Sequence, residues 1–552
     1  MPPATSAVQA AAGLHLVDWI VLVVYLLAMV AVGASFYKGQ KTTKDFFLAG
    51  RSMGWLPVGL SVVATLFSAI SYMSIPSGIQ MHGIVLSMCA FMVFLCIPFV
   101  TRIFMPFYSH MQVYSAYEYL EYRFDVSVRC LASAMFIAWR IVWMSLAVFS
   151  SSLALWAATD TPIPLWVIIL GLGAFATFYT YLGGMKAVIW TDVIQFLVLF
   201  GGMAIAAVLI IFKVDGGLSG IFEAMREAGK LEPLGNVPEI AAASGLWGKF
   251  IEFFTTQKAT LVGVLVASFV GHLAFYTVDQ ATVQRYFTAK SLEDSRRSFW
   301  VNAIANVTIH FCLAFLGMAL FAYFIKHPHP ATLVGEPFKF DWKYPYFIAT
   351  AMPVGVAGLL IAALYAATMS SVDSGINSCC TAFWVDFWQR LVHGQVKPQS
   401  DAGDEAQQHQ QLVVARVMTG VFGVIAILSA IAISIFGAGA IIELTSKLVN
   451  SFCGPMFAIF LLGMFTTRAR PLGVVIGAVT SVVVMNVLMH VEIYGRKLSW
   501  QWPAAVGLII ALGVGYVASL LEKAPAAEKL EWTFAKQSQK WQADEASTEA
   551  ET

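Results

Sequence analysis

The sequence predicts an all-α polytopic membrane protein, and three observations support this fold class. Of the 552 residues, 59% are hydrophobic and only 12% are charged, which is about half the charged share of a soluble domain. The mean hydropathy is +0.74. Charged residues gather in short segments between long apolar runs, as in proteins with many membrane spans. The net charge of +1 gives no reason to expect a nucleic-acid partner.

About thirteen apolar runs are long enough to cross a bilayer, because a transmembrane helix needs about 20 such residues. In chain order these runs cover roughly residues 17–37, 55–82, 84–106, 128–157, 163–184, 188–212, 252–283, 298–325, 346–388, 412–437, 439–465, 471–491 and 500–521.

Two basic connections, 37–54 and 283–298, set the expected orientation. Short cytoplasmic loops carry an excess of Lys and Arg, so both connections are expected in the cytoplasm. Alternation from there places the N-terminus outside and the C-terminus inside a plasma or inner membrane. The polar segment 396–411 is then a cytoplasmic linker, and the tail 522–552 is expected to be solvated and partly disordered. The second basic connection contains Arg285, Lys290, Arg296 and Arg297.

Two polar interruptions occur at corresponding places in the chain. The first is SAISYMSIPSG (68–78), where Pro76 lacks an amide hydrogen; the second is GHLAFYTVDQA (271–281). Transporters often contain inverted repeats whose helices are interrupted near the bilayer midplane. The two interruptions predict one repeat over 55–212 and another over 252–465. A simple proline kink is the alternative for the first interruption.

Residues outside the two repeats are expected to be additions to that core. The segment 1–54 would hold an extracellular N-terminus, an extra first helix and a cytoplasmic loop. Further helices would follow in 471–521, before the tail.

The stretch ATMSSVDSGINS (367–378) places polar side chains in the middle of an apolar run. Polar groups at that depth are costly and usually functional. Residues three or four apart share a helix face, so several of these side chains form one stripe. A hard, singly charged cation prefers oxygen ligands, and neutral oxygens release it easily. The alternative is that the hydroxyl groups bond back to carbonyls of their own helix. The polar members are Thr368, Ser370, Ser371, Asp373, Ser374 and Asn377.

Four further stretches are similar to the sodium:solute symporter family: DFFLAGRSMGW (45–55), YTYLGGMKAVIWTDVIQF (179–196), DQATVQRYFTAKS (279–291) and FLLGMFTTRARPLGVVIGA (460–478). The stretch 367–378 resembles the signature helix of that family. The family includes carriers of sugars, iodide, vitamins, monocarboxylates, proline and sialic acid. The resemblance runs from about residue 17 to 521 and implies a five-plus-five, leucine-transporter-like core.

The resemblance also implies a sodium site. The carbonyl groups of Ala64, Phe67 and Ala367 and the hydroxyl groups of Ser370 and Ser371 would hold the ion, which is the one expected cofactor. A second group, Asp192 and Thr368, is a candidate for a second sodium site or an exit path. The alternative for Asp192 is a carboxylate favoured by the dipole at a helix start. Asp373 has no fixed family role.

Substrate contacts are expected at the two interruptions. The candidates depart from the sugar carriers: Ser71 and His272 stand where those carriers use amides, and Phe275 and Tyr276 occupy the gate-aromatic positions. Arg140, in the middle of its span, could bind a carboxylate with two hydrogen bonds, or could instead pair with a protein acid. His272 could equally be an ordinary buried histidine.

The predicted function is a sodium-coupled secondary active symporter that imports a small organic solute, preferably one with a carboxylate, by alternating access. A sodium/sugar cotransporter is the first alternative, and a membrane sensor without net transport is the second. An enzyme is not expected, and no P-loop for a nucleotide is present. The expected partners are the solute, sodium and the lipid bilayer, with no obligatory protein partner.

Overall fold

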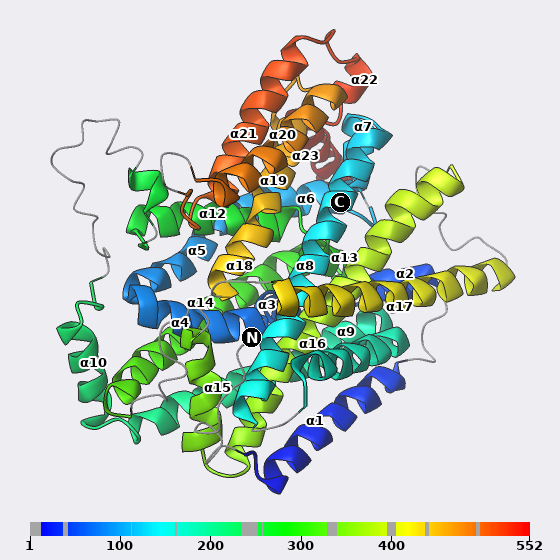
Figure 1. Ribbon diagram of the computed structural model, residues 1–552. Helices are drawn as coiled ribbons and strands as arrows, with labels where there is room; N and C mark the ends of the chain where they lie inside the picture. Colours follow the sequence, from blue (N-terminus) through cyan, green and yellow to red (C-terminus); the bar gives the residue numbers. More distant parts are fainter. Residues whose placement is uncertain are drawn as a thin grey trace.

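The structure is a computed structural model, and it is helical throughout the residues it describes (Figure 1). These are residues 13–36, 42–111, 113–159, 163–232, 252–256, 258–327, 339–394, 405–436, 441–492 and 497–551.

The first half of the chain contributes α1 (Leu16–Ser35), α2 (Thr43–Leu48), α3 (Trp55–Leu66), α4 (Ala69–His82), η3 (Ile84–Phe91), α5 (Met92–Phe99), η4 (Val100–Phe104), α6 (Met105–Met111), α7 (Glu118–Arg123), α8 (Val126–Ala158), α9 (Leu165–Ile211) and α10 (Gly217–Glu227).

The second half contributes α12 (Leu261–Thr277), α13 (Gln280–Thr288), α14 (Leu292–Lys326), α15 (Lys339–Ala351), α16 (Val356–Ala382), η6 (Phe383–Val392), α17 (Glu405–Phe436), α18 (Ile441–Leu448), α19 (Asn450–Phe465), α20 (Pro471–His490), α21 (Pro503–Leu520), α22 (Ala527–Leu530) and α23 (Phe534–Glu551).

Ten helical stretches in the described part of the chain are long and apolar enough to span a bilayer, and two bent helix pairs raise that number to twelve. The remaining predicted run, 163–184, corresponds to a shorter apolar helix over Leu165–Tyr181. That helix continues into the next span through Gly184, which has φ 57° and ψ −177°. A glycine adopts this conformation without the strain that a side chain would add. The polytopic, all-helical fold class is therefore confirmed.

The first interruption lies at the start of the predicted stretch 68–78. The helix breaks at Phe67 and Ser68, between α3 and α4, with a bend of 61°. Phe67 leaves helical geometry (ψ 87°), and the Ser68 hydroxyl accepts a hydrogen bond from the amide of Ile70 (3.1 Å), which begins the next helix. Pro76 lies inside α4. Pro76 does not interrupt α4, because a membrane helix tolerates a proline when its neighbours satisfy the freed backbone groups.

The second interruption lies where the sequence placed it. Helices α12 and α13 meet at Val278 and Asp279 with a bend of 49°. Asp279 begins α13, because its carboxylate accepts a hydrogen bond from the amide of Ala281 (3.0 Å). The two breaks are consistent with an inverted repeat, which stays a prediction.

Several predicted boundaries differ from those in the structure. The run 346–388 joins two elements: its beginning belongs to α15, and α16 starts only at Val356. The run 252–283 begins too early, since α12 starts at Leu261. Residues 396–404 of the predicted linker lie outside the described residues, and from Glu405 onward the chain is already the helix α17.

The tail is not a solvated, disordered end. Helices α22 and α23 fold back beside α7 and α19 (Figure 1). The indole of Trp541 stacks on His110 at 4.6 Å and meets the ring of Phe107 edge-on. Trp532 stacks on Tyr122 at 4.7 Å. The expectation failed because these aromatic residues bury their rings, which composition alone does not reveal.

Candidate functional site

The break after α3 creates carbonyl groups that need partners from elsewhere in the fold. The last four carbonyl groups of a helix accept no hydrogen bond from an amide of the same helix. The carbonyl of Val63 accepts a bond from the amide of Phe67 (2.8 Å), but those of Ala64 and Thr65 depend on other elements. Both lie buried where α3 faces the middle of α16.

Helix α16 supplies those partners through two adjacent serines. The hydroxyl of Ser370 donates to the carbonyl of Ala64 at 2.9 Å and lies 3.1 Å from the carbonyl of Ala367. The hydroxyl of Ser371 donates to the carbonyl of Thr65 at 3.2 Å. Neutral oxygen atoms from both helices therefore converge within hydrogen-bond distance, and such oxygens are the ligands of a hard cation.

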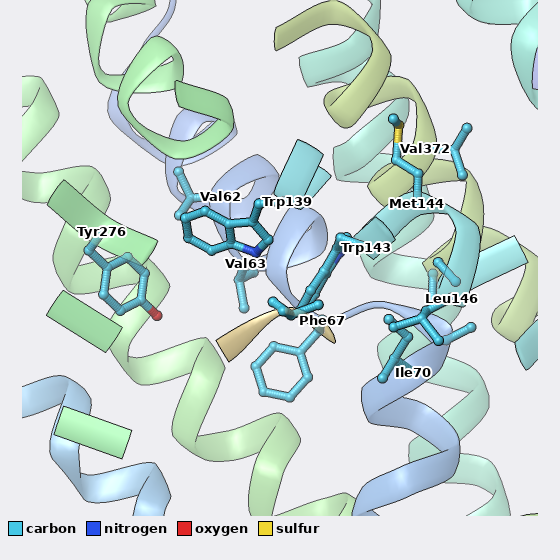
Figure 2. Packing of buried hydrophobic residues seen from close by; sticks show 14 of the residues in the cluster. Val62, Val63, Phe67, Ile70, Trp139, Trp143, Met144, Leu146, Tyr276 and Val372 are labelled. Atoms are coloured by element: carbon cyan, nitrogen blue, oxygen red, sulfur yellow. The ribbon is translucent and has the colours of Figure 1, made fainter. Parts of the chain in front are cut away.

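Four of the five predicted sodium ligands thus come together, and Thr65 joins them. The fifth, Phe67, stands at the break itself. Figure 2 shows Phe67 as a member of the buried hydrophobic cluster that also contains Trp139 and Trp143. The Phe67 side chain is buried. Thr65 was missed because its role depends on where α3 stops.

The predicted second group does not form one cluster. Thr368 bonds to Ser151 of α8 and to the carbonyl of Leu364 (3.2 Å). Asp192 instead faces Ser61 of α3, whose hydroxyl donates to its carboxylate at 2.5 Å. These two residues therefore belong to different surroundings.

Asp192 forms a buried ion pair with Arg285. A guanidinium nitrogen of Arg285 lies 2.9 Å from Oδ2 of Asp192, and both side chains are fully buried. The same guanidinium donates to Ser61 at 2.7 Å and also to Ser374 of the signature helix. Arg285 was expected in a connection between two spans, and that expectation was wrong, since Arg285 lies inside α13. The second carboxylate oxygen of Asp192, Oδ1, has no partner among the described residues.

A second buried carboxylate lies on the same helix as Ser374. The hydroxyl of Tyr179 donates to Asp373 at 2.5 Å and lies 3.0 Å from the carbonyl of Met369. The hydroxyl groups of Ser374 and Thr65 are 3.0 Å apart. A chain of polar contacts therefore connects the break in α3 with Asp192, Arg285 and Asp373.

Arg140 is paired with a protein acid, the alternative that its sequence left open. Its guanidinium binds the carboxylate of Asp279 with two nitrogens, one of them at 3.1 Å, and both side chains are fully buried. Arg140 therefore does not need a bound solute to neutralise its charge. One nitrogen, Nη1, still has no partner among the described residues, so Arg140 retains a donor at the break between α12 and α13.

The other predicted substrate residues lie along α12 and α4. The ring of Phe275 packs edge-on against Trp139 (5.0 Å) and Trp143 (5.5 Å) of α8. His272 stacks on Tyr276 at 5.8 Å, and the Nδ1 atom of His272 is buried without a partner among the described residues.

Tyr276 and Ser71 complete the predicted set. The hydroxyl of Tyr276 accepts a bond from Asn306 (3.3 Å). Ser71 is half-buried, and no hydrogen bond in the described structure joins it to Arg140 or His272. The predicted substrate residues therefore line the two breaks without forming one connected set.

The main omissions of the sequence reasoning are the ion-pair partners, Arg285 and Asp279. Asp279 was quoted only as part of the second interruption and Arg285 only as part of a basic connection, so neither was given a role as an ion-pair partner. A charged residue inside an apolar run needs a partner, and that requirement is the signal that could have found them.

Comparison with known proteins identifies the family. The family model described as "Sodium:solute symporter family" matches residues 46–481. The chain belongs to this family. A sodium/sialic acid symporter of Proteus mirabilis is 31% identical over 92% of this chain and 95% of its own length. The human sodium-coupled monocarboxylate transporter 1 is 28% identical over 83% of this chain and 71% of its own length. This symporter is accordingly a transporter and not an enzyme.

Solved structures agree with the fold of this symporter. A sodium-coupled sialic acid symporter, solved in a substrate-bound outward-open state described as revealing a novel sodium site, has a TM-score of 0.78 at 30% identity. It covers 92% of this chain and 99% of its own. The nucleobase-cation symporter Mhp1 has a TM-score of 0.50 at 12% identity and matches in fold alone. Sodium is thus a co-substrate of this chain, not a resident cofactor.

Proposed function

We propose that this symporter couples inward sodium movement to the uptake of a small carboxylate-bearing solute by alternating access. The convergence of Ser370 and Ser371 on the carbonyls of Ala64 and Thr65 at the end of α3 is the observation that carries the proposal. It supports a cation site between a broken helix and the signature helix, where opening of either side would change the ligands.

Energetics make one sodium ion sufficient for strong accumulation. A membrane potential of 100 mV contributes about 2.3 kcal/mol per charge. Each tenfold sodium gradient adds about 1.4 kcal/mol. Together these terms support an accumulation of roughly several hundred-fold per ion.

The carboxylate preference rests on chemistry and on relatives. Arg140 Nη1 and His272 Nδ1 are buried polar atoms near the breaks, and neither has a partner in the described structure. A carboxylate can accept hydrogen bonds from such donors. Sialic acid and monocarboxylate symporters are among the relatives of this chain, and their solutes carry that group.

The remaining expectations extend this proposal. The chain has about thirteen spans, ten of which form a five-plus-five inverted-repeat core, with the N-terminus outside and the C-terminus in the cytoplasm. The free Oδ1 atom of Asp192 marks a second ion position or an exit path. Thr368 lies apart from it and bonds to Ser151.

Proteoliposome uptake with and without sodium tests the proposal. We expect Ser371→Ala to weaken sodium activation by about tenfold, since one ligand worth about 1.4 kcal/mol is lost. Ser378→Ala is the matched control, because the Ser378 hydroxyl bonds only to carbonyls of its own helix, those of Ser374 (2.8 Å) and Gly375 (3.0 Å). Uptake that is indifferent to sodium and to Ser371→Ala would refute the site.

Competition for uptake then tests the solute class. We expect organic acids to compete and neutral hexoses to leave uptake unchanged. Arg140→Lys should raise the KM for the acid, because a single ammonium replaces the planar guanidinium. Competition by glucose that is unchanged in Arg140→Lys would reject the carboxylate preference while leaving the sodium site standing.

A further inference from the structure

A hollow of about 580 Å³ lies on the outside of the helix bundle, between α5, η4 and the first turns of α14. It belongs neither to the sodium site nor to the breaks. Its lining combines arginines with one carboxylate and with aromatic rings. The residues used below are Phe94, Arg102, Glu293, Arg296, Arg297 and Trp300.

The hollow carries an excess of positive charge. Its three arginines face one glutamate, which leaves two positive charges. Arg297 pairs with Glu293 at 3.0 Å, but both side chains are more than half exposed (60% and 58%), so solvent weakens that pair. Arg102 is exposed and has no hydrogen-bond or ion-pair partner in the described residues.

One arginine of the hollow, Arg296, is held in place by a backbone carbonyl of η4. The Nε atom of Arg296 donates to the carbonyl of Thr101 at 3.1 Å. That bond fixes the guanidinium against η4 and leaves the two terminal nitrogens without a partner in the described residues. A guanidinium with free terminal nitrogens is well suited to bind a phosphate group with two hydrogen bonds.

The hollow lies at the level of lipid headgroups. Helix α14 has 35 residues and so is about 52 Å long, well beyond the ~30 Å of the hydrocarbon core. Apart from Lys326, which is the last residue of the helix, its charged residues fall in the first six positions, directly before the apolar run that starts at 298. Trp300 is 51% exposed, as expected for an interfacial aromatic belt. Exposed rings of α5, including Phe94, continue from the hollow toward the lipid.

We propose that this hollow binds an anionic phospholipid, with its phosphate on Arg102, Arg296 and Arg297 and an acyl chain against Phe94 and Trp300. Basic pockets between transmembrane helices bind anionic headgroups in this way. A zwitterionic lipid would bring its own cation to an already positive site, and a soluble phosphate would leave the rings unused. In the proposed orientation this lipid belongs to the cytoplasmic leaflet. The site is separate from solute transport and goes beyond the proposed function.

Native mass spectrometry of the full-length protein, with equal amounts of phosphatidylglycerol and phosphatidylcholine, tests this site. We expect the wild-type protein to retain phosphatidylglycerol preferentially. Arg102→Gln/Arg297→Gln should lose roughly five-fold in affinity per arginine removed. Arg468→Gln/Lys523→Gln removes the same charge from exposed positions outside the hollow and should keep the preference.

Three outcomes would overturn the proposal. The first is an unchanged lipid preference in the Arg102→Gln/Arg297→Gln variant. The second is an equal loss in the Arg468→Gln/Lys523→Gln control, which would show a general charge effect. The third is full displacement of the lipid by an equal concentration of glycerol phosphate, which would identify a site for a soluble anion. If the double variant does not fold, Arg102→Gln alone makes the same comparison.

Discussion

At the scale of single residues, the buried pair of Arg140 and Asp279 is the most sensitive contact near the proposed solute site. Both groups are fully buried, and Asp279 also begins α13. Removing one partner leaves an uncompensated charge, which typically costs about 3–5 kcal/mol.

We therefore expect Asp279→Asn to lower thermal stability strongly. The double variant Asp279→Asn/Arg140→Gln should recover most of the loss, because no charge then stays buried. Thermal unfolding of the two single variants and the double variant measures the coupling. Losses of stability that simply add in the double variant would show that Arg140 and Asp279 do not stabilise the protein as a pair.

Asp341 offers a pH-dependent test outside the membrane spans. It lies in α15, and its Oδ2 atom accepts a bond from the amide of Ile441 at 3.0 Å. Burial raises the pKa of Asp341 to about 7. The folded state therefore holds the proton more tightly than the unfolded state, whose aspartate titrates near pH 4.

The stability contribution of protonated Asp341 is complete below about pH 4 and is lost as the pH rises through about 7. We expect Asp341→Asn to remove this dependence, since the amide cannot ionise. The melting temperature of the wild type should therefore fall relative to that of the variant from pH 4 to pH 7, and the difference between the two should stay constant above pH 7. A difference that does not vary with pH would contradict the shifted titration.

At the scale of elements, the signature helix α16 is capped by a residue of α1. The carboxylate of Asp18 accepts bonds from the amides of Gly355 (2.7 Å) and Gly358 (2.8 Å). Gly358 permits this approach, because a Cβ atom there would lie 2.5 Å from the backbone of Asp18. The first helix of the chain thus satisfies orphan amides at the start of α16.

We expect Asp18→Ala to cost about 1–2 kcal/mol in stability, the usual value of a lost N-terminal cap. Asp18→Asn should cost clearly less, because the amide oxygen can still accept both bonds. Guanidinium or thermal unfolding in detergent provides the measurement. Equal losses of stability in Asp18→Ala and Asp18→Asn would show that the charge of Asp18 stabilises the protein, and not its hydrogen bonds to the two amides.

Elements also show how far sequence reasoning reaches. The spans followed from apolar length, because crossing a bilayer is a local requirement. The break after α3 falls at the start of the predicted stretch, but the sequence alone does not show which carbonyls beside it are bonded by Ser370 and Ser371, about 300 positions later in the chain. Arg285 was assigned to a loop for the same reason, because only the fold brings it to Asp192. The sequence alone was enough to propose the serines of the signature helix as ligands, because hydroxyl groups stand out in an apolar run.

At the scale of the whole molecule, the tail connects elements that are far apart in sequence. Its Trp532 and Trp541 cover α7 and α6, and the Nζ atom of Lys529 donates to the carbonyl of Glu121 at 2.9 Å. Phe534 packs against Phe465 at the end of α19. The tail therefore packs against three separate parts of the bundle, namely α6, α7 and the end of α19.

We expect Trp541→Ala to destabilise the protein by about 3 kcal/mol, since a buried indole and its ring contacts are lost. Gln542→Ala changes the next, exposed residue and should have little effect. The melting temperatures of both variants in the same detergent give the comparison. A solvated tail would make the two variants indistinguishable.

The docking of this tail also has a consequence for biosynthesis. Residues 527–551 leave the ribosome more than 400 codons after residues 107–122, which form part of the surface that they cover. Until the tail is made, the rings of Phe107 and Tyr122 lack these neighbours, and exposed aromatic surface of this kind attracts chaperones and proteases. A molecule whose tail is missing or undocked would keep that surface open. Quality control can therefore distinguish molecules of this symporter with a docked tail from those without one, before either carries any solute.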